Sequence, residues 1–346
     1  MTPEHGGPGA RGRAPVDFST NAHAGGPCPQ ALALVLAADA QHYPDASYQA
    51  LRSELAAFHG VAVQRVLLAA SASEFIQRIT AVGQRLSPGP VAVPLRAYGD
   101  YARAAHAWGR ALVQPGTPRA TLRWHADPGS PAGQDDPPVA DEGKPPIVAA
   151  TTVDVDRAFA TDDDRVASAT VLDAVYAPLR LTGHSGWHAA ARDQVFVLHS
   201  PNKALGLCGV RAAYAIAPAA PRWQPWLQAL ASATPSWPLG GQGVALLQAW
   251  CRPAARAWLD ASLPQLRQWK AVQVAALQSR GCQVAPGHAP FFAVRPPAHW
   301  DPAALWQHGV QVRDASSLGL PGWWRVNTLA PLAQAALWRA LDGAAP

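Results

Sequence analysis

The spacing of apolar residues changes period several times along the chain. Short apolar runs such as residues 65–70 predict buried strands, and longer segments with a period near 3.6 predict amphipathic helices. The pattern predicts strands over residues 65–70, 90–94, 147–151, 169–172, 195–199, 212–217, 291–294, 309–312 and 324–327. It predicts helices over residues 29–40, 47–59, 73–84, 99–108 and 332–341, with a long helical region over residues 221–280.

This alternation of strands and helices favours an α/β architecture whose central sheet is covered by helices on both faces. We predict a large α/β domain over residues 30–220, with its boundary to a smaller α+β domain inside the helical region 221–280. The small domain would combine residues 1–29 with residues 281–346. Residues 115–146 are rich in Pro, Gly and Asp with little periodicity, which predicts a surface loop or an insertion.

Composition narrows the classes of function. The formal net charge is +5 and no segment interleaves basic with aromatic residues, so nucleic-acid binding has little support. No apolar run reaches ~18 residues, which argues against a membrane span. The first residues lack the basic and apolar regions of a secretory signal, and the four cysteines share no metal-ligand spacing. We therefore expect a reduced, cytoplasmic protein without a metal site.

Lysine is scarce: the chain has three lysines, at positions 144, 203 and 270. A lysine kept against such a bias is a candidate for chemistry that arginine cannot perform, above all attack on a carbonyl as a neutral amine. Lys144 lies in a Pro/Gly/Asp-rich stretch and Lys270 among polar neighbours, so both are expected to be solvated surface charges. Lys203 follows a predicted strand and is the candidate nucleophile.

Polar side chains follow three of the predicted strands. Asp173 and Tyr176 follow one strand, Ser200 and Lys203 follow another, and Ser71-Ala72-Ser73 begins a helix after a third. Ligands of open α/β sheets bind outside the carboxyl ends of the strands, and a helix N-terminus with small residues can hold a phosphate. Each feature alone also has an ordinary explanation, since Ser-x-Ser and Asp often cap helices and turns.

The combination of these residues with Arg211, eight positions after Lys203, resembles the fold-type-I pyridoxal-phosphate enzymes of the class I/II aminotransferase superfamily. The resemblance implies an aminotransferase-like fold with pyridoxal 5′-phosphate as cofactor. Lys203 would form the Schiff base, Asp173 would pair with the pyridine nitrogen, and Tyr176 would hydrogen-bond the phenolic oxygen. The cofactor phosphate would be held by Ser71, Ala72, Ser73, Ser200 and Arg211.

Further motifs resemble the branch that contains threonine-phosphate decarboxylases and histidinol-phosphate aminotransferases. These are Val-Asp-Phe-Ser-Thr-Asn at residues 16–21, His-Tyr-Pro-Asp at 42–45, and the closing segment 312–326. The resemblance implies a homodimer with shared sites, in which Tyr43 reaches the cofactor phosphate of the neighbouring subunit and Tyr98 lies over the cofactor ring. Four residues would contact the substrate: His5, Asn21, Arg313 and Arg325, the last gripping its carboxylate.

The opening His-Gly-Gly and the segment around Arg313 are more similar to threonine-phosphate decarboxylase. That resemblance implies a lyase converting L-threonine O-3-phosphate into (R)-1-aminopropan-2-yl phosphate in cobalamin biosynthesis. The alternatives are a histidinol-phosphate-type aminotransferase and a non-catalytic descendant that serves as a binding protein. The family's Asn-Pro-x-Asn-Pro-Thr-Gly segment is expected near residues 148–156, which hold no asparagine, so that Thr151 or Thr152 would substitute.

Overall fold

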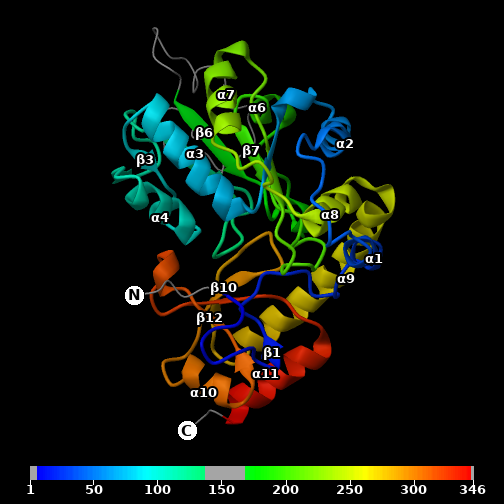
Figure 1. Ribbon diagram of the computed structural model, residues 1–346. Helices are drawn as coiled ribbons and strands as arrows, with labels where there is room; N and C mark the ends of the chain where they lie inside the picture. The colour runs from blue at the N-terminus through cyan, green and yellow to red at the C-terminus, as the bar shows by residue number, and fades with distance from the viewer. Residues whose placement is uncertain (1–5, 137–167, 344–346) are drawn as a thin grey trace.

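The computed structural model describes residues 6–136 and 168–343, and its largest element is a seven-stranded sheet in the order β2-β8-β7-β6-β5-β3-β4 (Figure 1). Its strands are β2 (Val66–Ala69), β3 (Val91–Ala92), β4 (Leu112–Val113), β5 (Leu122–Ala126), β6 (Ala169–Asp173), β7 (Phe196–His199) and β8 (Ala213–Ile216). Neighbouring strands are parallel except that β8 is antiparallel to both β2 and β7. The predicted α/β class with a mostly parallel sheet is confirmed.

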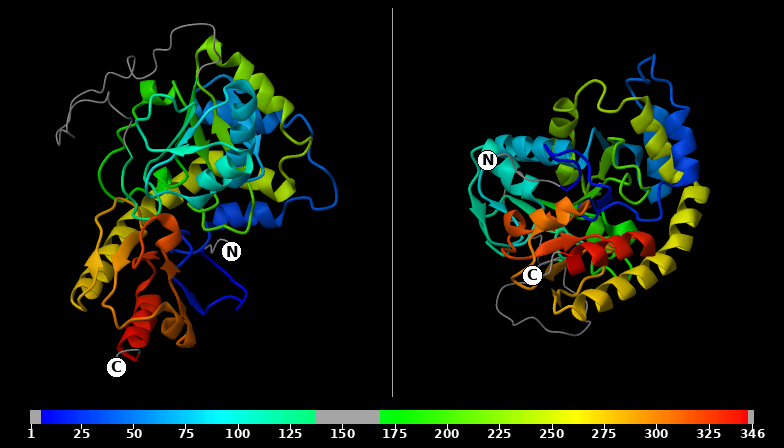
Figure 2. Two further views of the ribbon diagram at one scale, coloured as in Figure 1. Left: turned by 90° about the vertical axis from the view of Figure 1, so that its left-hand side faces the viewer. Right: turned by 90° about the horizontal axis from the view of Figure 1, so that it is seen from below.

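Helices cover both faces of this sheet, as Figures 1 and 2 show. One face carries α1 (Pro29–Leu36), α2 (Gln49–His59) and α8 (Gly241–Cys251); the other carries α3 (Ala72–Leu86), α4 (Gly99–Ala107) and α7 (Gln224–Ser232). The alternation within β2 explains the two cores, because Val66 and Leu68 pack into the first while Leu67 and Ala69 pack into the second. Shorter turns of helix are α6 (Ala189–Arg192), η1 (Val63–Arg65), η2 (Ala177–Leu179), η3 (Pro221–Trp223) and η4 (Ser316–Leu318).

A second region lies beside the large sheet and combines the two ends of the described chain (Figure 1). Its four-stranded sheet has the order β12-β13-β10-β9, and a separate parallel pair joins β1 to β11. The strands are β1 (Val16–Asp17), β9 (Gln283–Val284), β10 (Phe292–Arg295), β11 (Val310–Gln311), β12 (Arg313–Asp314) and β13 (Trp324–Val326). The helices are α10 (Pro302–Gln307) and α11 (Pro331–Gly343). The long helix α9 (Pro253–Gln278) joins the two regions, because Ala255 and Leu259 pack into the core of the large sheet and Leu277 into the core of the second region. Phe18 of the N-terminal arm is fully buried in the core of this region, while the predicted domain boundaries stay a prediction.

The prediction of an irregular segment over residues 115–146 is wrong in part. Leu122–Ala126 form β5, which lies between β3 and β6 in the middle of the large sheet. Arg123 and His125 interrupt the apolar run, and this concealed the strand from the hydrophobic pattern. The strand predicted over residues 147–151 falls outside the described residues. Over the two ranges that are described, no helix combines the length and apolarity needed to cross a membrane.

Candidate active site

Three neighbouring parallel strands end beside one cavity. β5 ends at Ala126, β6 at Asp173 and β7 at His199. Because the carboxyl ends of parallel strands share one edge of a sheet, the segments that follow them meet there. A cavity of about 700 Å³ lies at this edge, and Arg313 and Arg325 of the small sheet line it as well. The cavity therefore lies between the two regions of the fold.

Lys203 lies in the loop that follows β7 and lines the cavity. The neighbouring Asn202 holds this loop, because its side-chain amide donates to the backbone oxygens of Cys208 and Val210 at 3.4 and 3.2 Å. The backbone oxygen of Lys203 itself accepts a hydrogen bond of 2.9 Å from the backbone amide of His23. The backbone at Lys203 is thus tied both to its own loop and to the N-terminal arm.

The surroundings of Lys203 favour its neutral form. Burial lowers the pKa of its amine, and the charges of Arg211 and Arg325 lower it further, against the opposite effects of Cys208 and Asp173. Its Nζ lies 5.8 Å from the centre of the Tyr176 ring. An amine with a lowered pKa is a better nucleophile at neutral pH, because a larger fraction is unprotonated.

Asp173 is the last residue of β6 and is buried at the cavity wall. Its Oδ1 accepts a hydrogen bond of 3.0 Å from the backbone amide of Val175, and its Oδ2 accepts one of 2.5 Å from the hydroxyl of Tyr101. Burial raises the pKa of this carboxyl, while the two hydrogen bonds and the charge of Lys203 lower it. Each oxygen therefore has one donor that favours the carboxylate form.

Tyr176 follows Asp173 by three residues and faces the same cavity. Burial raises the pKa of its phenol to about 12, so the hydroxyl is protonated at neutral pH. The side-chain amide of Asn21 donates to this hydroxyl at 3.3 Å. Because the Tyr176 oxygen accepts this hydrogen bond, the hydroxyl hydrogen of Tyr176 can be donated to another group. Among the described residues, Oδ1 of Asn21 has no hydrogen-bond partner although it is buried.

The start of α3 offers backbone amides to the cavity. Ser71 is the N-cap, and its hydroxyl accepts a hydrogen bond of 3.1 Å from the backbone amide of Glu74. Ala72 and Ser73 line the cavity, and the Ser73 hydroxyl lies 3.1 Å from the hydroxyl of Tyr98. The free amides and positive end of a helix suit an anion. Of the predicted phosphate ligands in this turn, Ser71 thus serves the helix cap while the other two face the cavity.

Ser200 directly follows β7, Arg211 lies shortly before β8, and both line the cavity. Ser200 is buried, and its hydroxyl is within donating distance of Oδ1 of Asn202 at 3.0 Å and of the Ala212 backbone oxygen at 3.2 Å. Arg211 brings a guanidinium to the same cavity as the amides of α3. A phosphate placed between these elements would meet a cation, a helix N-terminus and two hydroxyls.

Arg313 and Arg325 stand directly opposite each other on the antiparallel strands β12 and β13. Only 4% and 8% of their surfaces are exposed, and both line the cavity. Nη2 of Arg313 donates to the Ser317 hydroxyl at 2.8 Å. Nη1 and Nη2 of Arg325 donate to the Ser130 hydroxyl at 3.1 Å and to the Ser19 backbone oxygen at 2.6 Å. Like charges at directly opposite positions repel, so this pair is suited to an anion bound between them.

One described site residue, Tyr43, lies away from these groups. Tyr43 is 79% exposed, does not line the cavity, and stacks on Trp237 with ring centres 4.6 Å apart. His5 falls outside the described residues. The remaining predicted residues other than Ser71 all line the one cavity, including Asn21 and Tyr98. Their roles stay predictions.

A second candidate for the family's Asn-Pro-x-Asn-Pro-Thr-Gly segment lies directly after β5. The strand that pairs with the Asp173 strand is β5, and the residues after it, 127–133, read Asp-Pro-Gly-Ser-Pro-Ala-Gly. The prolines and the final glycine match the pattern, and Ser130 stands where the second asparagine is expected. Residues 148–156, where the segment was expected, lie outside the described residues. Ser130 was missed because its strand was not recognised, although the Pro-x-x-Pro-x-Gly spacing was readable.

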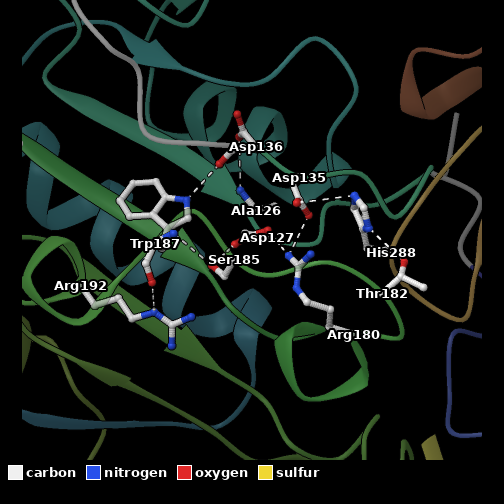
Figure 3. Close-up of polar contacts among 10 residues, drawn as sticks. All are labelled: Ala126, Asp127, Asp135, Asp136, Arg180, Thr182, Ser185, Trp187, Arg192 and His288. Atoms are coloured by element: carbon white, nitrogen blue, oxygen red, sulfur yellow. Dashed lines mark hydrogen bonds and ion pairs between the residues drawn. The ribbon is translucent and has the colours of Figure 1, made fainter. Parts of the chain in front are cut away.

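A polar network fixes this segment, as Figure 3 shows. Arg180 donates to carboxylate oxygens of both Asp127 and Asp135, and the Ser185 hydroxyl donates to Asp127. His288 of the small-sheet region donates its backbone amide to Gly133 at 2.6 Å and lies 3.6 Å from the Asp135 carboxylate. The loop that carries Ser130 is therefore anchored to both regions of the fold.

Lys270 is not the solvated surface charge that we expected. Its Nζ donates to the backbone oxygens of Gly287 and Ala289 at 2.6 and 2.7 Å, and burial lowers its pKa to about 8. These two oxygens belong to the same β9–β10 connection that reaches Gly133 through His288. Lys270 thus stabilises a turn beside the site, and it does not line the cavity.

Tyr101 is a second residue that the sequence analysis missed. It is fully buried, lines the cavity, and stacks on Trp124 of β5 with ring centres 4.4 Å apart. Its hydroxyl is the donor to Asp173 described above. The signal was present, because Tyr101 follows Tyr98 by three residues and the start of a helix brings such residues to one side.

A comparison with protein-family models matches residues 167–343 to "Aminotransferase class I and II". Among solved structures, L-threonine-O-3-phosphate decarboxylase from Porphyromonas gingivalis is similar with a TM-score of 0.72 and 18% identity, covering 94% of this chain and 98% of that one. Histidinol-phosphate aminotransferase from Sinorhizobium meliloti, solved with pyridoxal-5′-phosphate, has a TM-score of 0.76 and 19% identity over 99% and 95% of the two chains.

A third similar structure is aspartate aminotransferase from Thermus thermophilus with maleate, which has a TM-score of 0.73 and 16% identity over 94% and 89% of the two chains. No curated protein matches the sequence. At these identities the structural similarities establish the fold alone.

Proposed function

The chain belongs to the aminotransferase class I and II family, and from this premise we propose that it is a pyridoxal-phosphate-dependent carboxy-lyase of a phosphorylated amino acid. The proposed substrate is L-threonine O-3-phosphate and the product is 1-aminopropan-2-yl phosphate, an intermediate of cobalamin biosynthesis. The cofactor is pyridoxal 5′-phosphate, which the family and the similar structure with bound cofactor both indicate.

The residues of the cavity fit this cofactor. Lys203 supplies an amine with a lowered pKa, Asp173 supplies a buried carboxylate, and Arg211 with the α3 amides supplies an anion site. Oδ1 of Asn21 is a buried acceptor with no partner among the described residues, so a bound ligand is expected to satisfy it. When bound, the cofactor supplies an aldehyde that condenses with amines and a ring that accepts an electron pair from a bond to Cα.

The proposal of a doubly anionic substrate rests on Arg313 and Arg325, which lie directly opposite each other on adjacent strands and both line the cavity. Both side chains are buried. Burial lowers the pKa of Arg325, and the charge of Arg313 acts in the same direction. Among the described residues, Arg325 makes no ion pair with a carboxylate, and its Nε is buried without a hydrogen-bond partner. The buried charge of Arg325 is therefore stabilised when a carboxylate binds to it. We assign Arg325 to the substrate carboxylate and Arg313, with Ser317, to its phosphate.

In this proposal the chain's own residues orient the substrate and move one proton. Arg325 and Arg313 hold the two ends of the substrate, which fixes the rotation about the bond between Cα and the amino nitrogen. For decarboxylation these residues would hold the bond between Cα and the carboxylate carbon perpendicular to the cofactor ring, and Lys203 would then return a proton to Cα. If Cα–H were perpendicular instead, the same lysine would remove that proton and the enzyme would be an aminotransferase.

Cofactor attachment is tested by borohydride reduction of the purified protein with added cofactor, followed by mass spectrometry of the peptides. We expect the reduced cofactor on the peptide that contains Lys203, and no attachment in Lys203→Ala. Lys270→Arg is the matched control, since it removes a buried lysine that does not line the cavity. Attachment elsewhere, or none in the wild type, contradicts the enzyme proposal and favours a binding protein.

The reaction is tested by incubating the loaded enzyme with L-threonine O-3-phosphate labelled in the carboxylate. The proposal expects release of labelled carbon dioxide without an added 2-oxo acid. Turnover only with a 2-oxo acid would make the chain an aminotransferase. Arg313→Gln should raise KM for the phosphorylated substrate about tenfold or more, because it removes a charged hydrogen-bond donor, while KM for the unphosphorylated amino acid changes little.

We further propose that the enzyme is a homodimer. Tyr43 and Trp237 form an exposed stacked pair whose rings lie outside the cavity of their own chain. Large exposed aromatic rings are typical of residues that become buried in an interface. Sedimentation of the wild type should give twice the mass of one chain, and Tyr43→Ala should weaken cofactor binding if this residue reaches the neighbouring site.

A further inference from the structure

The carboxylate of Asp173 is held by two donors of different kinds. The backbone amide of Val175 belongs to the same turn and is provided by the local fold. The hydroxyl of Tyr101 comes from α4, seventy-two residues earlier in the chain. At 2.5 Å this second bond lies in the range of a hydroxyl donating to an ionised oxygen. It is therefore the contact that a substitution can remove without disturbing the strand.

The Tyr101 ring is placed by its packing. It is fully buried, lies nearly parallel to the Trp124 ring at an angle of 11°, and meets the Tyr98 ring edge to face at 5.9 Å. Trp124 belongs to β5, the strand that pairs with the Asp173 strand. The hydroxyl is thus supported by the same sheet that carries its acceptor, and rotation of the ring would break the stacking.

We propose that Tyr101 is a positioning residue of the cofactor site: its hydroxyl holds the Asp173 carboxylate in the orientation and charge state that keep a proton on the pyridine nitrogen of the cofactor. Each oxygen of Asp173 accepts from one donor, so the plane of the carboxylate is fixed, and Asp173 lines the cavity. This inference rests on the proposed role of Asp173.

The other groups around Asp173 explain why this donor matters. Among the described residues, the titratable groups that interact with the carboxylate are Tyr101 from α4, Tyr176 from the following turn, and Lys203 from the loop after β7. Burial raises the pKa of Asp173 and thereby favours the protonated acid, which cannot hold the pyridinium proton. Burial also raises the pKa of Tyr101 well above its ordinary value, so Tyr101 remains a donor throughout the neutral range.

The test measures binding of pyridoxamine 5′-phosphate against pH by quenching of tryptophan fluorescence. This probe lacks the aldehyde, so its affinity reports the ring and phosphate contacts without any linkage to Lys203. In the wild type, affinity should fall at low pH as Asp173 is protonated. In Tyr101→Phe, which keeps the stacked ring, the midpoint of that fall should move up by about one to two pH units, the effect of losing a charged hydrogen bond.

Two controls separate this role from a structural one. Tyr214→Phe removes another fully buried phenol hydroxyl from the same sheet, where it contacts His59 and Trp250 at 2.8 and 3.0 Å, and should leave the midpoint unchanged. Tyr101→Phe should have no further effect in an Asp173→Asn background, because its action passes through the carboxylate. Melting temperatures of all variants without the probe show whether each one folds.

Each outcome decides one claim. An Asp173→Asn variant that binds the probe as the wild type does would overturn the role of Asp173, and with it this inference. If Asp173→Asn binds weakly while Tyr101→Phe follows the wild-type profile, only the inference about Tyr101 fails. An equal loss of affinity on Tyr101→Phe in both backgrounds would also overturn it, because the tyrosine would then act through packing.

Discussion

Ser130→Ala tests whether the loop after β5 positions Arg325 to bind the substrate carboxylate. The change removes one hydroxyl, whose oxygen accepts a hydrogen bond of 3.1 Å from Nη1 of Arg325. Both residues are buried, with 7% and 8% of their surfaces exposed. The guanidinium would keep its bond of 2.6 Å from Nη2 to the Ser19 backbone oxygen and could pivot about it.

The expected magnitude follows from the bond that is lost. A hydrogen bond to a charged group contributes about 1.5–3 kcal/mol, equivalent to roughly 10- to 150-fold in an equilibrium constant. Because Arg325 retains its bond to the Ser19 backbone oxygen and the opened space can admit water, we expect the lower end. Affinity for L-threonine O-3-phosphate should therefore fall about tenfold. Affinity for 1-aminopropan-2-yl phosphate, which has no carboxylate, should change little.

The assay compares the dissociation constants of these two ligands by the spectral change of the loaded enzyme. Ser130→Asn is the matched variant, because its side-chain oxygen can accept the same bond, and it should retain most of the preference for the carboxylate. An equal loss of affinity for both ligands in Ser130→Ala would refute the reasoning, since the serine would then act on the cavity as a whole.

Two further predictions concern stability. Gly206 has a φ of +68°, and an added Cβ would lie 2.6 Å from the Gly26 backbone oxygen. Gly206→Ala should therefore lower the free energy of unfolding by more than about 1 kcal/mol, and it should also weaken cofactor binding. Gly209→Ala in the same loop, with nothing within 4 Å of its Cβ, should be nearly neutral in urea unfolding. The pKa of Lys270 is lowered from 10.5 to about 8 in the folded protein, so between these pH values the unfolded chain binds more protons than the folded chain. The free energy of unfolding should therefore rise with pH across this window, by up to about 1.4 kcal/mol per pH unit. Lys270→Met should lose this rise, measured as the difference between the two proteins' unfolding free energies; identical pH profiles would contradict it.

The elements that the hydrophobic pattern predicted well are those whose apolar runs are unbroken. β2, β6 and β8 are buried at every position, and their boundaries differ from the predicted ones by at most one residue. β5 was missed because His125 is almost fully buried in spite of its polarity. In the folded protein it lies 3.4 Å from the Asp136 carboxylate, a partner that the sequence pattern does not reveal.

The sequence by itself determined the part of the site that is local in the chain. Asp173 ends β6, Tyr176 follows it, and Ser200 and Lys203 follow β7. Parallel strands must bring such positions to one edge of a sheet. A scarce lysine after a strand was enough to identify the candidate nucleophile. These inferences needed only the order of elements along the chain.

The tertiary structure decided which distant residues complete that site. The contact of Tyr101 with Asp173, the bond from Arg325 to Ser130 and the opposition of Arg313 to Arg325 depend on strand order, register and the packing of one region on the other. Register moves a side chain to the opposite face when it shifts by one residue, and no local pattern records it across such separations. Long-range contacts therefore determine which side chains from distant parts of the sequence line this cavity together.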